Sequence, residues 1–292
     1  MSNLNDNNTG DNRYGNAPDK SPSLAIGSLQ DLNFTAITVE HVEHILTLTL
    51  NRPEKRNAIN QTMINELIHA LDYAKQKRDV RVVILAANGP VFCAGGDLKA
   101  MASAERGDNA VVSNIPHRGE FDDLALRLHH LNKPTIAKIQ GSVFAGALMF
   151  VSQVTHAIAV DSATFAAPEI LRGLWPFQVM ASLCQIMTPR AGLDFIMRGQ
   201  TIKAPQAVEA GLINDSVPAA DLDKSVAALA NELASLAPGA MALGLQAYHA
   251  QLDMSVDKAL PYLKQQLQIC LEGDDAKEGI AAFFEKRAPV WK

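Results

Sequence analysis

Residues 92–98 read FCAGGDL, and this stretch decides the fold because it links a buried strand to the start of a helix. The preceding run VVILA at residues 82–86 is apolar and β-branched, which is typical of a strand inside a core. Two adjacent glycines, Gly95 and Gly96, permit positive φ angles and close backbone approach, so that an N–H group can point into a cavity. We therefore predict a strand, a glycine turn and a helix, with the Gly96 N–H as a candidate hydrogen-bond donor.

Strands and helices alternate on both sides of this stretch. Upstream, residues 36–39 and 45–50 predict a β-hairpin, and Asn60 predicts the N-cap of a helix with apolar positions at 3.6-residue spacing. Downstream, the pattern predicts a helix at 121–131, a strand at 135–139, a helix at 145–153 and a strand at 156–160. Because the helices supply the crossovers, we expect the strands to pair in parallel.

The chain divides into three predicted parts. Residues 1–31 are rich in Asn, Asp, Ser and Gly and are predicted to form a disordered tail, because they cannot bury enough apolar area to offset the entropy of ordering. Residues 32–215 are predicted to form an α/β core, and residues 216–292 a C-terminal helical region. After Pro168 the apolar periodicity is helical, so the C-terminal third is predicted to be all helix.

Composition limits the kinds of partner. The chain has 292 residues, 48% of them hydrophobic and 20% charged, with a net charge of −5 and scattered positive charges, so we expect a soluble protein that does not bind nucleic acid. No run approaches 18 apolar residues, and we expect no contact with a membrane. The cysteines, Cys93, Cys184 and Cys270, lack a C-x-x-C spacing, and the histidines lack a metal-ligand spacing. We therefore expect no metal and a cytoplasmic location.

A second glycine turn and a glutamate follow the first turn. Residues 141–146 read GSVFAG, and the first N–H groups of the helix that follows lack intrahelical partners, which makes Gly146 a second candidate donor. Two such donors on one carbonyl stabilise an oxyanion. Residues 165–169 read FAAPE and supply Glu169, whose apolar neighbours predict a raised pKa suited to proton transfer. Each turn also fits a simple strand-to-helix connection, and Glu169 also fits a carboxylate at a helix N-terminus.

Six separated segments together resemble the crotonase (enoyl-CoA hydratase/isomerase) superfamily. They are residues 50–60, 92–99, 133–137, 141–146, 165–173 and 278–287. The resemblance implies a crotonase-like spiral of ββα units with a C-terminal all-helical region. It also implies an acyl-CoA thioester substrate, no separate cofactor because coenzyme A belongs to the substrate, and a homotrimer or dimer of trimers held partly by the C-terminal helices.

The resemblance also assigns roles to individual residues. Gly96 and Gly146 match the residues whose N–H groups hold the thioester oxygen, and Glu169 matches a catalytic glutamate. The positions that match substrate contacts are Lys55, Arg56, Ala58, Ala94, Asp97, Leu98, Met149, Pro168, Phe283 and Lys286. Of these, Phe283 and Lys286 match positions that often reach the coenzyme A of a neighbouring subunit. Solvated surface charge is the alternative interpretation of the three cationic side chains.

One departure from the family pattern bears on the reaction. Hydratases of this family usually carry a second glutamate three residues after the second glycine donor, where this chain has Met149. A methionine cannot activate water by proton transfer. One carboxylate suffices for a proton shuttle, so double-bond isomerisation with Glu169 as the base is the preferred reaction. The alternatives are hydration, decarboxylation of a malonyl-type thioester, and acyl-CoA binding with reduced catalysis.

Overall fold

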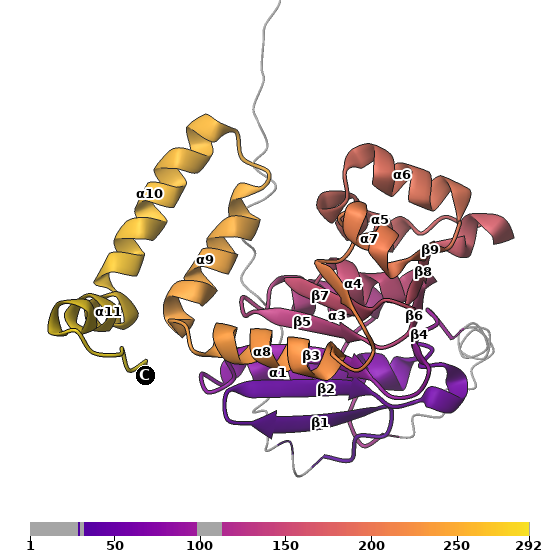
Figure 1. Ribbon diagram of the computed structural model, residues 1–292, viewed down its shortest axis with the longest axis horizontal. Coiled ribbons are helices and arrows are strands. Elements are labelled where there is room, and N and C mark those ends of the chain that lie inside the picture. The colour runs from indigo at the N-terminus through magenta and orange to yellow at the C-terminus, as the bar shows by residue number, and fades with distance from the viewer. Residues whose placement is uncertain (1–28, 30–31, 98–112, 292) are drawn as a thin grey trace, which may run out of the picture.

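The computed structural model describes residue 29, residues 32–97 and residues 113–291. Apart from residue 29, the predicted tail at 1–31 lies outside these residues, and so does Leu98. The described chain forms two β-sheets with helices packed around them and a set of C-terminal helices that extends away from the sheets (Figure 1).

The larger sheet carries most of the core. Its strands, in spatial order, are β1 (Ile37–Val42), β2 (Ile45–Leu50), β3 (Val82–Ala87), β5 (Thr135–Ile139), β7 (His156–Val160) and β10 (Asp215–Val217). The hairpin β1–β2 is antiparallel, and the pairs β2–β3, β3–β5 and β5–β7 are parallel, as predicted from the intervening helices. Strand β10, which was not predicted, also pairs in parallel with β7. Leu46, Leu48 and Leu50 alternate inward along β2 and are almost completely buried. Burial of each such side chain stabilises the fold by about 1.5–3 kcal/mol.

The smaller sheet consists of β4 (Val91–Cys93), β6 (Ser142–Phe144), β8 (Thr164–Ala166) and β9 (Ile202–Lys203). Each of its first three strands follows a strand of the larger sheet after a short corner, so that strand, corner and strand repeat three times. Successive corners touch: a Cβ on Gly141 would lie 2.2 Å from the carbonyl oxygen of Pro90, which excludes any side chain there. This repetition is the predicted spiral of ββα units.

Two helices cover the sheets near the glycine turns. Helix α1 (Gln61–Gln76) begins where predicted, because the Asn60 side chain accepts a hydrogen bond of 3.0 Å from the Met63 N–H. Helix α3 (Phe121–His129) packs against α1. The predicted helix at 145–153 is wrong in its first half. A 3₁₀ turn, η3 (Ala145–Leu148), precedes the short α4 (Met149–Ser152), since the φ angle of 54° at Ala145 does not fit an α-helix.

The remaining elements are mostly helical. They are η2 (Pro53–Lys55), η4 (Pro168–Arg172), α5 (Phe177–Ile186), α6 (Pro189–Arg198), α7 (Ala204–Glu209), α8 (Leu222–Ala234), α9 (Pro238–Gln251), α10 (Val256–Glu272) and α11 (Asp274–Glu285). The prediction of an all-helical C-terminal third is wrong at β9 and β10, which have two and three residues and are too short to show a strand period. Within the described residues no single helix is long and apolar enough to cross a membrane. The bent pair α8 and α9, taken together, has a length and composition that would suffice.

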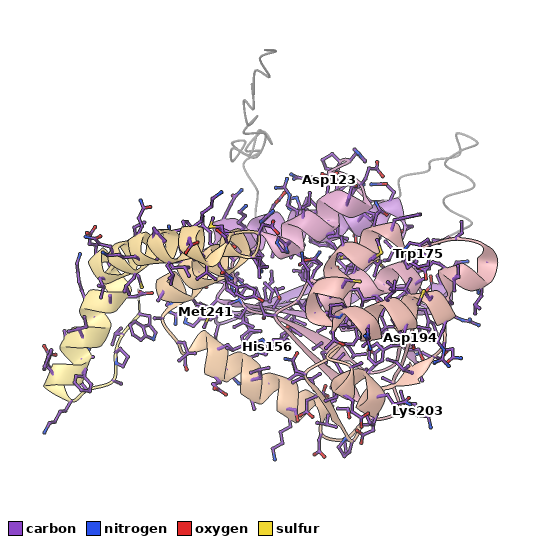
Figure 2. The ribbon with its side chains drawn as sticks, turned by 90° about the horizontal axis from the view of Figure 1, so that it is seen from above. Asp123, His156, Trp175, Asp194, Lys203 and Met241 are labelled. Carbon is purple, nitrogen blue, oxygen red and sulfur yellow. The ribbon has the colours of Figure 1, made fainter. Side chains whose placement is uncertain are left out.

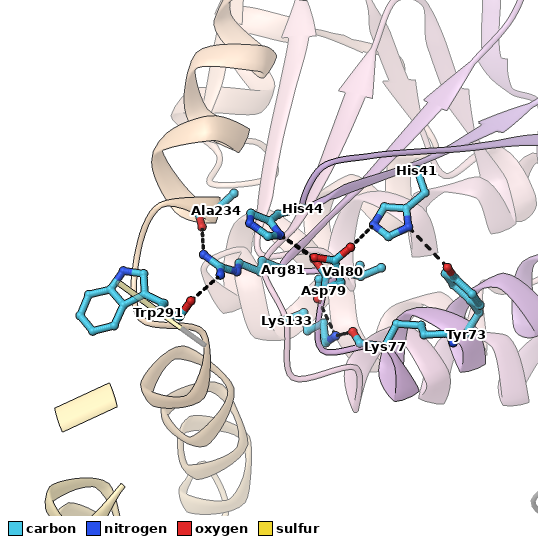
Figure 3. Close-up of polar contacts among 10 residues, drawn as sticks. All are labelled: His41, His44, Tyr73, Lys77, Asp79, Val80, Arg81, Lys133, Ala234 and Trp291. Carbon is cyan, nitrogen blue, oxygen red and sulfur yellow. Dashed lines mark hydrogen bonds and ion pairs between the residues drawn. The ribbon is translucent and has the colours of Figure 1, made fainter. Parts of the chain in front are cut away.

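Residues 238–291, which we call the C-terminal arm, are tied to the sheets through Arg81 (Figure 3). The Arg81 guanidinium donates hydrogen bonds to the backbone oxygens of Ala234 at 3.1 Å and Trp291 at 3.2 Å. The Trp291 indole in turn donates to the Ser235 oxygen at 2.7 Å. Beside this cluster the Lys133 ammonium binds three backbone oxygens at the end of α1, and burial lowers the pKa of Lys133 to about 8.

Candidate active site

Three parallel strands bring the glycine turns and the glutamate to one edge of the smaller sheet. Cys93 of β4 pairs with Val143 of β6, and Val143 pairs with Phe165 of β8. Because the carboxyl ends of parallel strands lie at the same edge, the segments that follow these strands emerge side by side. Those segments carry Gly96, Gly146 and Glu169, so residues separated by 73 positions meet in one region.

The first turn is fixed by a short backbone bridge to Ile59. The Ile59 N–H donates to the Gly95 oxygen at 2.8 Å, and the Asp97 N–H donates to the Ile59 oxygen at 2.8 Å. In such a ladder successive N–H groups alternate in direction, so the Gly96 N–H points away from Ile59. Gly95 has a φ angle of 93°, and a Cβ there would lie 2.9 Å from the Phe144 oxygen. Only glycine fits at this position, and the two turns are in direct contact.

The second turn contains a strained residue immediately before its candidate donor. Ala145 has a φ angle of 54°, a left-handed conformation that costs a non-glycine residue about 1–2 kcal/mol. Gly146 follows in the first turn of η3, where N–H groups have no intrahelical partner. A Cβ on Gly146 would lie 3.8 Å from the Gly96 nitrogen. Gly96 is exposed and Gly146 is half-buried.

Glu169 lies in an environment that raises the pKa of its carboxyl group. It lies in η4 directly after Pro168 and is half-buried, and its Oε2 atom is buried without a hydrogen-bond partner among the described residues. Burial raises the pKa of this carboxyl, while a backbone hydrogen bond and the charge of Arg172 lower it by less. The raised pKa predicted from the apolar flanking residues is therefore confirmed.

Met149, the position at which the resemblance described above implies a second glutamate in hydratases, lies in the core. It is the first residue of α4, three residues after Gly146, and its exposed fraction is 1%. Its thioether can fill apolar space but cannot donate or accept a proton in catalysis. Among the first five described residues after each of β4, β6 and β8, the acidic residues are Asp97 and Glu169.

The stretch predicted to lie along coenzyme A does pack beside the first turn. Lys55 and Arg56 are exposed at η2, and the Arg56 oxygen accepts a hydrogen bond of 3.0 Å from the Ala94 N–H. The Arg52 guanidinium bonds both the Ala58 oxygen and the Asp97 carboxylate, the latter at 3.2 Å. The Asp97 carboxylate is thus paired with Arg52, whereas Lys55 and Arg56 are exposed to solvent.

Two residues near the turns had not been predicted to contribute. Asn57 is completely buried, and its side-chain amide donates to the oxygens of Asn88 at 2.8 Å and Val91 at 2.9 Å. Its φ angle of 52° suits an asparagine better than most residues, but this is not readable from the sequence. Phe121 has a ring carbon 3.7 Å from the position of a Cβ on Gly146. Its placement depends on how α3 packs on α1, so no local signal reveals it.

The structure does not bring Phe283 and Lys286 to the glycine turns of the same chain. Both lie at the end of α11, in the arm that extends away from the smaller sheet (Figure 1). A second view also places Met241 of the arm well apart from Trp175, which follows η4 (Figure 2). Phe283 is 78% exposed. Within the described residues, no cluster of three or more His, Cys, Asp or Glu side chains could hold a metal ion.

Repeated ββα units in two sheets, with two apposed glycine turns at one sheet edge, define a protein of the crotonase fold. The chain belongs to the enoyl-CoA hydratase/isomerase family, whose sequence profile matches residues 40–292. It is therefore an enzyme of the crotonase type, in a family that acts on acyl-CoA substrates.

Individual relatives agree with this assignment. The human enoyl-CoA hydratase domain-containing protein 3, mitochondrial, is 28% identical over 257 residues, which cover 87% of this chain and 82% of the relative. The 2,3-dehydroadipyl-CoA hydratase of Escherichia coli (strain K12) is 30% identical over 258 residues, covering 88% and 98%. The crystal structure of an enoyl-CoA hydratase from Mycobacterium smegmatis matches with a TM-score of 0.79 and 27% identity, covering 88% of this chain and 99% of that one.

Proposed function

We propose that the chain isomerises the double bond of an enoyl-CoA thioester, with Glu169 as the shuttling base. The observation that carries this proposal is the difference between the two carboxylates at the strand ends. Asp97 is bound to Arg52, whereas Glu169 has a raised pKa and a buried oxygen without a partner among the described residues. Met149 stands at the position of a second family glutamate, which leaves one carboxylate for proton transfer.

The proposed reaction moves one proton and two electron pairs. Glu169 takes a proton from C2 of a 3-enoyl-CoA, and the C–H electrons form a dienolate whose charge rests on the thioester oxygen. The Gly96 and Gly146 N–H groups bind that oxygen, and the loss of one such donor typically costs a factor of about 10²–10³ in rate. Glu169 then returns the proton to C4, which yields the conjugated 2-enoyl-CoA. No cofactor is required beyond the coenzyme A of the substrate.

Hydration of a 2-enoyl-CoA is the second candidate, because two of the similar proteins named above are called hydratases. Hydration would need a water held by backbone groups or by Glu169 alone, since Met149 cannot hold it by proton transfer. Hydration would therefore be favoured by a carboxylate at residue 149, whereas isomerisation requires no carboxylate at this position.

The purified chain can be tested with 3-hexenoyl-CoA and 2-hexenoyl-CoA in separate assays. Formation of the conjugated thioester from 3-hexenoyl-CoA reports isomerisation. Disappearance of the conjugated thioester in the assay with 2-hexenoyl-CoA reports hydration. We expect isomerisation in the wild type and a loss of about 10²–10⁴-fold in Glu169→Gln. Full turnover in Glu169→Gln would refute the role of this carboxylate.

Met149→Glu provides the matched comparison, because it restores the second family glutamate. We expect the ratio of hydration to isomerisation to rise in this variant. A wild type that hydrates 2-hexenoyl-CoA as its main reaction would favour the second candidate.

The proposal extends to substrate binding and assembly. We propose that Lys55 and Arg56, which are both exposed, bind the coenzyme A nucleotide. Leu98 keeps its predicted role as a proposal, although it lies outside the described residues. The arm exposes large apolar side chains on α10 and α11, among them Val256, Leu260, Leu267, Phe283 and Phe284. We propose that copies of the chain cover this surface in a homotrimer or dimer of trimers, in which Phe283 and Lys286 reach a neighbouring site. A cytoplasmic location stays a prediction.

Light scattering after gel filtration tests the assembly. The wild type is expected to have the mass of three or six chains, and the double variant Phe283→Ser, Phe284→Ser a lower mass. A monomeric wild type would contradict this part of the proposal without affecting the assignment of Glu169.

A further inference from the structure

The ring of Phe121 borders the space in front of the two glycine turns. The three atoms nearest to a Cβ placed on Gly146 would be Phe121 Cζ at 3.7 Å, the Gly96 nitrogen at 3.8 Å and Phe121 Cε2 at 3.9 Å. The ring is partly buried against the core, so one part of it is packed and another part remains accessible. Phe121 therefore lies beside the two glycine turns, on the side of Gly146 that a Cβ would occupy.

We propose that Phe121 determines which acyl groups the site accepts, by closing the space beside the α-carbon to branched thioesters. This inference rests on the proposed function, in which the Gly96 and Gly146 N–H groups bind a thioester oxygen. An oxygen about 3 Å from both nitrogens brings the attached carbonyl carbon and α-carbon within van der Waals reach of the ring. A linear acyl group can lie along the ring, whereas an α-methyl group requires volume that the ring occupies.

Helix α1 fixes the segment that carries the ring. Asn65 accepts a hydrogen bond of 2.8 Å from the Arg118 N–H, and Gln61 donates to the Gly119 oxygen at 2.7 Å. The Arg118 guanidinium lies 2.6 Å from His69 Nδ1. Gln61, Asn65 and His69 are spaced four residues apart and thus share one face of α1. Phe121 follows directly after this anchored segment and is held at the start of α3.

The same helix fixes the first glycine turn. Ile59, which bridges Gly95 and Asp97 through two backbone hydrogen bonds of 2.8 Å, is separated from α1 only by its N-cap Asn60. The segment before Phe121 and the first glycine turn are therefore held by the same helix, the turn next to its N-terminal end and the segment along the face of Gln61, Asn65 and His69. A side chain fixed in this way can reject a poorly fitting group, because it cannot easily move aside to accept it.

Binding of two saturated thioesters tests the inference independently of the reaction. Butyryl-CoA and isobutyryl-CoA contain the same atoms, and only the second is branched at the α-carbon. Neither can be hydrated or isomerised, so calorimetry measures their affinities directly. We expect the wild type to prefer butyryl-CoA by roughly 10–200-fold, the range for one misplaced carbon in an apolar pocket. Phe121→Ala is expected to reduce that preference at least about tenfold.

Leu126→Ala serves as the control, because Leu126 lies on the same helix and is 54% exposed. Its preference is expected to match the wild type. If Phe121→Ala does not fold, Phe121→Leu replaces it, with an intermediate preference expected. An unchanged preference in the folded Phe121 variant, or a wild type that binds both thioesters equally, overturns the inference alone. A wild type that binds neither thioester overturns the proposed function as well.

Discussion

At the scale of single residues, the site combines groups that the fold keeps in unfavourable states. Ala145 adopts a left-handed backbone conformation, and Glu169 holds a carboxyl oxygen that is buried without a partner among the described residues. Strain and unpaired polar atoms of this kind concentrate at functional sites, where they reduce stability. The surrounding structure compensates through residues such as Asn57, whose side chain is fully hydrogen-bonded in the core.

Glu169→Gln should raise the melting temperature near pH 7 more than near pH 4. The pKa of Glu169 is raised in the folded chain, so folding favours its protonated form. The stabilisation due to that form is complete below pH 4.5 and is lost as the pH rises through the folded pKa. Glutamine carries no charge to lose, so the advantage of the variant grows as the pH rises.

Thermal unfolding of both proteins from pH 4 to pH 8 measures this difference. The exposed Glu209 on α7 provides the control substitution, Glu209→Gln. A melting-temperature difference for Glu169→Gln that stays constant with pH would show that the carboxyl ionises in the folded chain as it does in the unfolded chain.

At the scale of elements, the strand ends of the smaller sheet build the site and glycine allows them to touch. Gly95→Ala should lower both stability and activity, because the new Cβ would lie 2.9 Å from the Phe144 oxygen and the φ angle of 93° disfavours alanine. We expect a loss of about 1–3 kcal/mol in the free energy of unfolding. Displacement of the Gly96 N–H should lower the rate by up to about 10²–10³-fold.

Gly244→Ala is the matched control for this substitution. Gly244 lies inside α9, and a Cβ there would meet nothing within 4 Å. Alanine should stabilise the helix by about 0.5–1 kcal/mol and leave turnover unchanged. Urea unfolding measures the stability of both variants, and turnover assays measure their rates. Equal changes in Gly95→Ala and Gly244→Ala would show that the contact between the turns is not important.

The sequence predicted the longer strands of the larger sheet well, but it missed β10 of that sheet and the short strands of the smaller sheet. Strands β3, β5 and β7 have five or six residues of apolar and β-branched character, so their period is visible. Strands β4, β6 and β8 have three residues each, and their neighbours are far apart in the chain. The position of the Phe121 ring beside Gly146 was likewise unpredictable, since it results from helix packing. The glycine turns and Glu169 were readable because glycine and proline mark them locally.

At the scale of the whole molecule, Arg81 bonds the end of the C-terminal arm beside β3, while His249 of α9 stacks on His129 of α3. Arg81→Ala should increase hydrogen exchange at residues 235–251 and near Trp291, because two backbone oxygens lose a charged donor. A hydrogen bond to a charged group contributes about 1.5–3 kcal/mol. Strands β3, β5 and β7 should keep their protection, since their pairing does not involve this side chain.

Hydrogen exchange followed by mass spectrometry resolves the two regions. Arg190→Ala, at an exposed position on α6, is the control and should exchange like the wild type. Unchanged exchange in the arm of Arg81→Ala would mean that contacts of α8 and α9 alone hold the arm in place.

The bond between Arg81 and Trp291 spans 210 positions of the chain. At a synthesis rate of about 5–20 residues per second, Arg81 is synthesised roughly 10–40 s before Trp291. During that interval the strands around Arg81 can pair, while the guanidinium still faces water. The arm therefore joins sheets that have already had time to pair, and the bond from Arg81 to Trp291 forms after the pairing of β2, β3 and β5 has become possible.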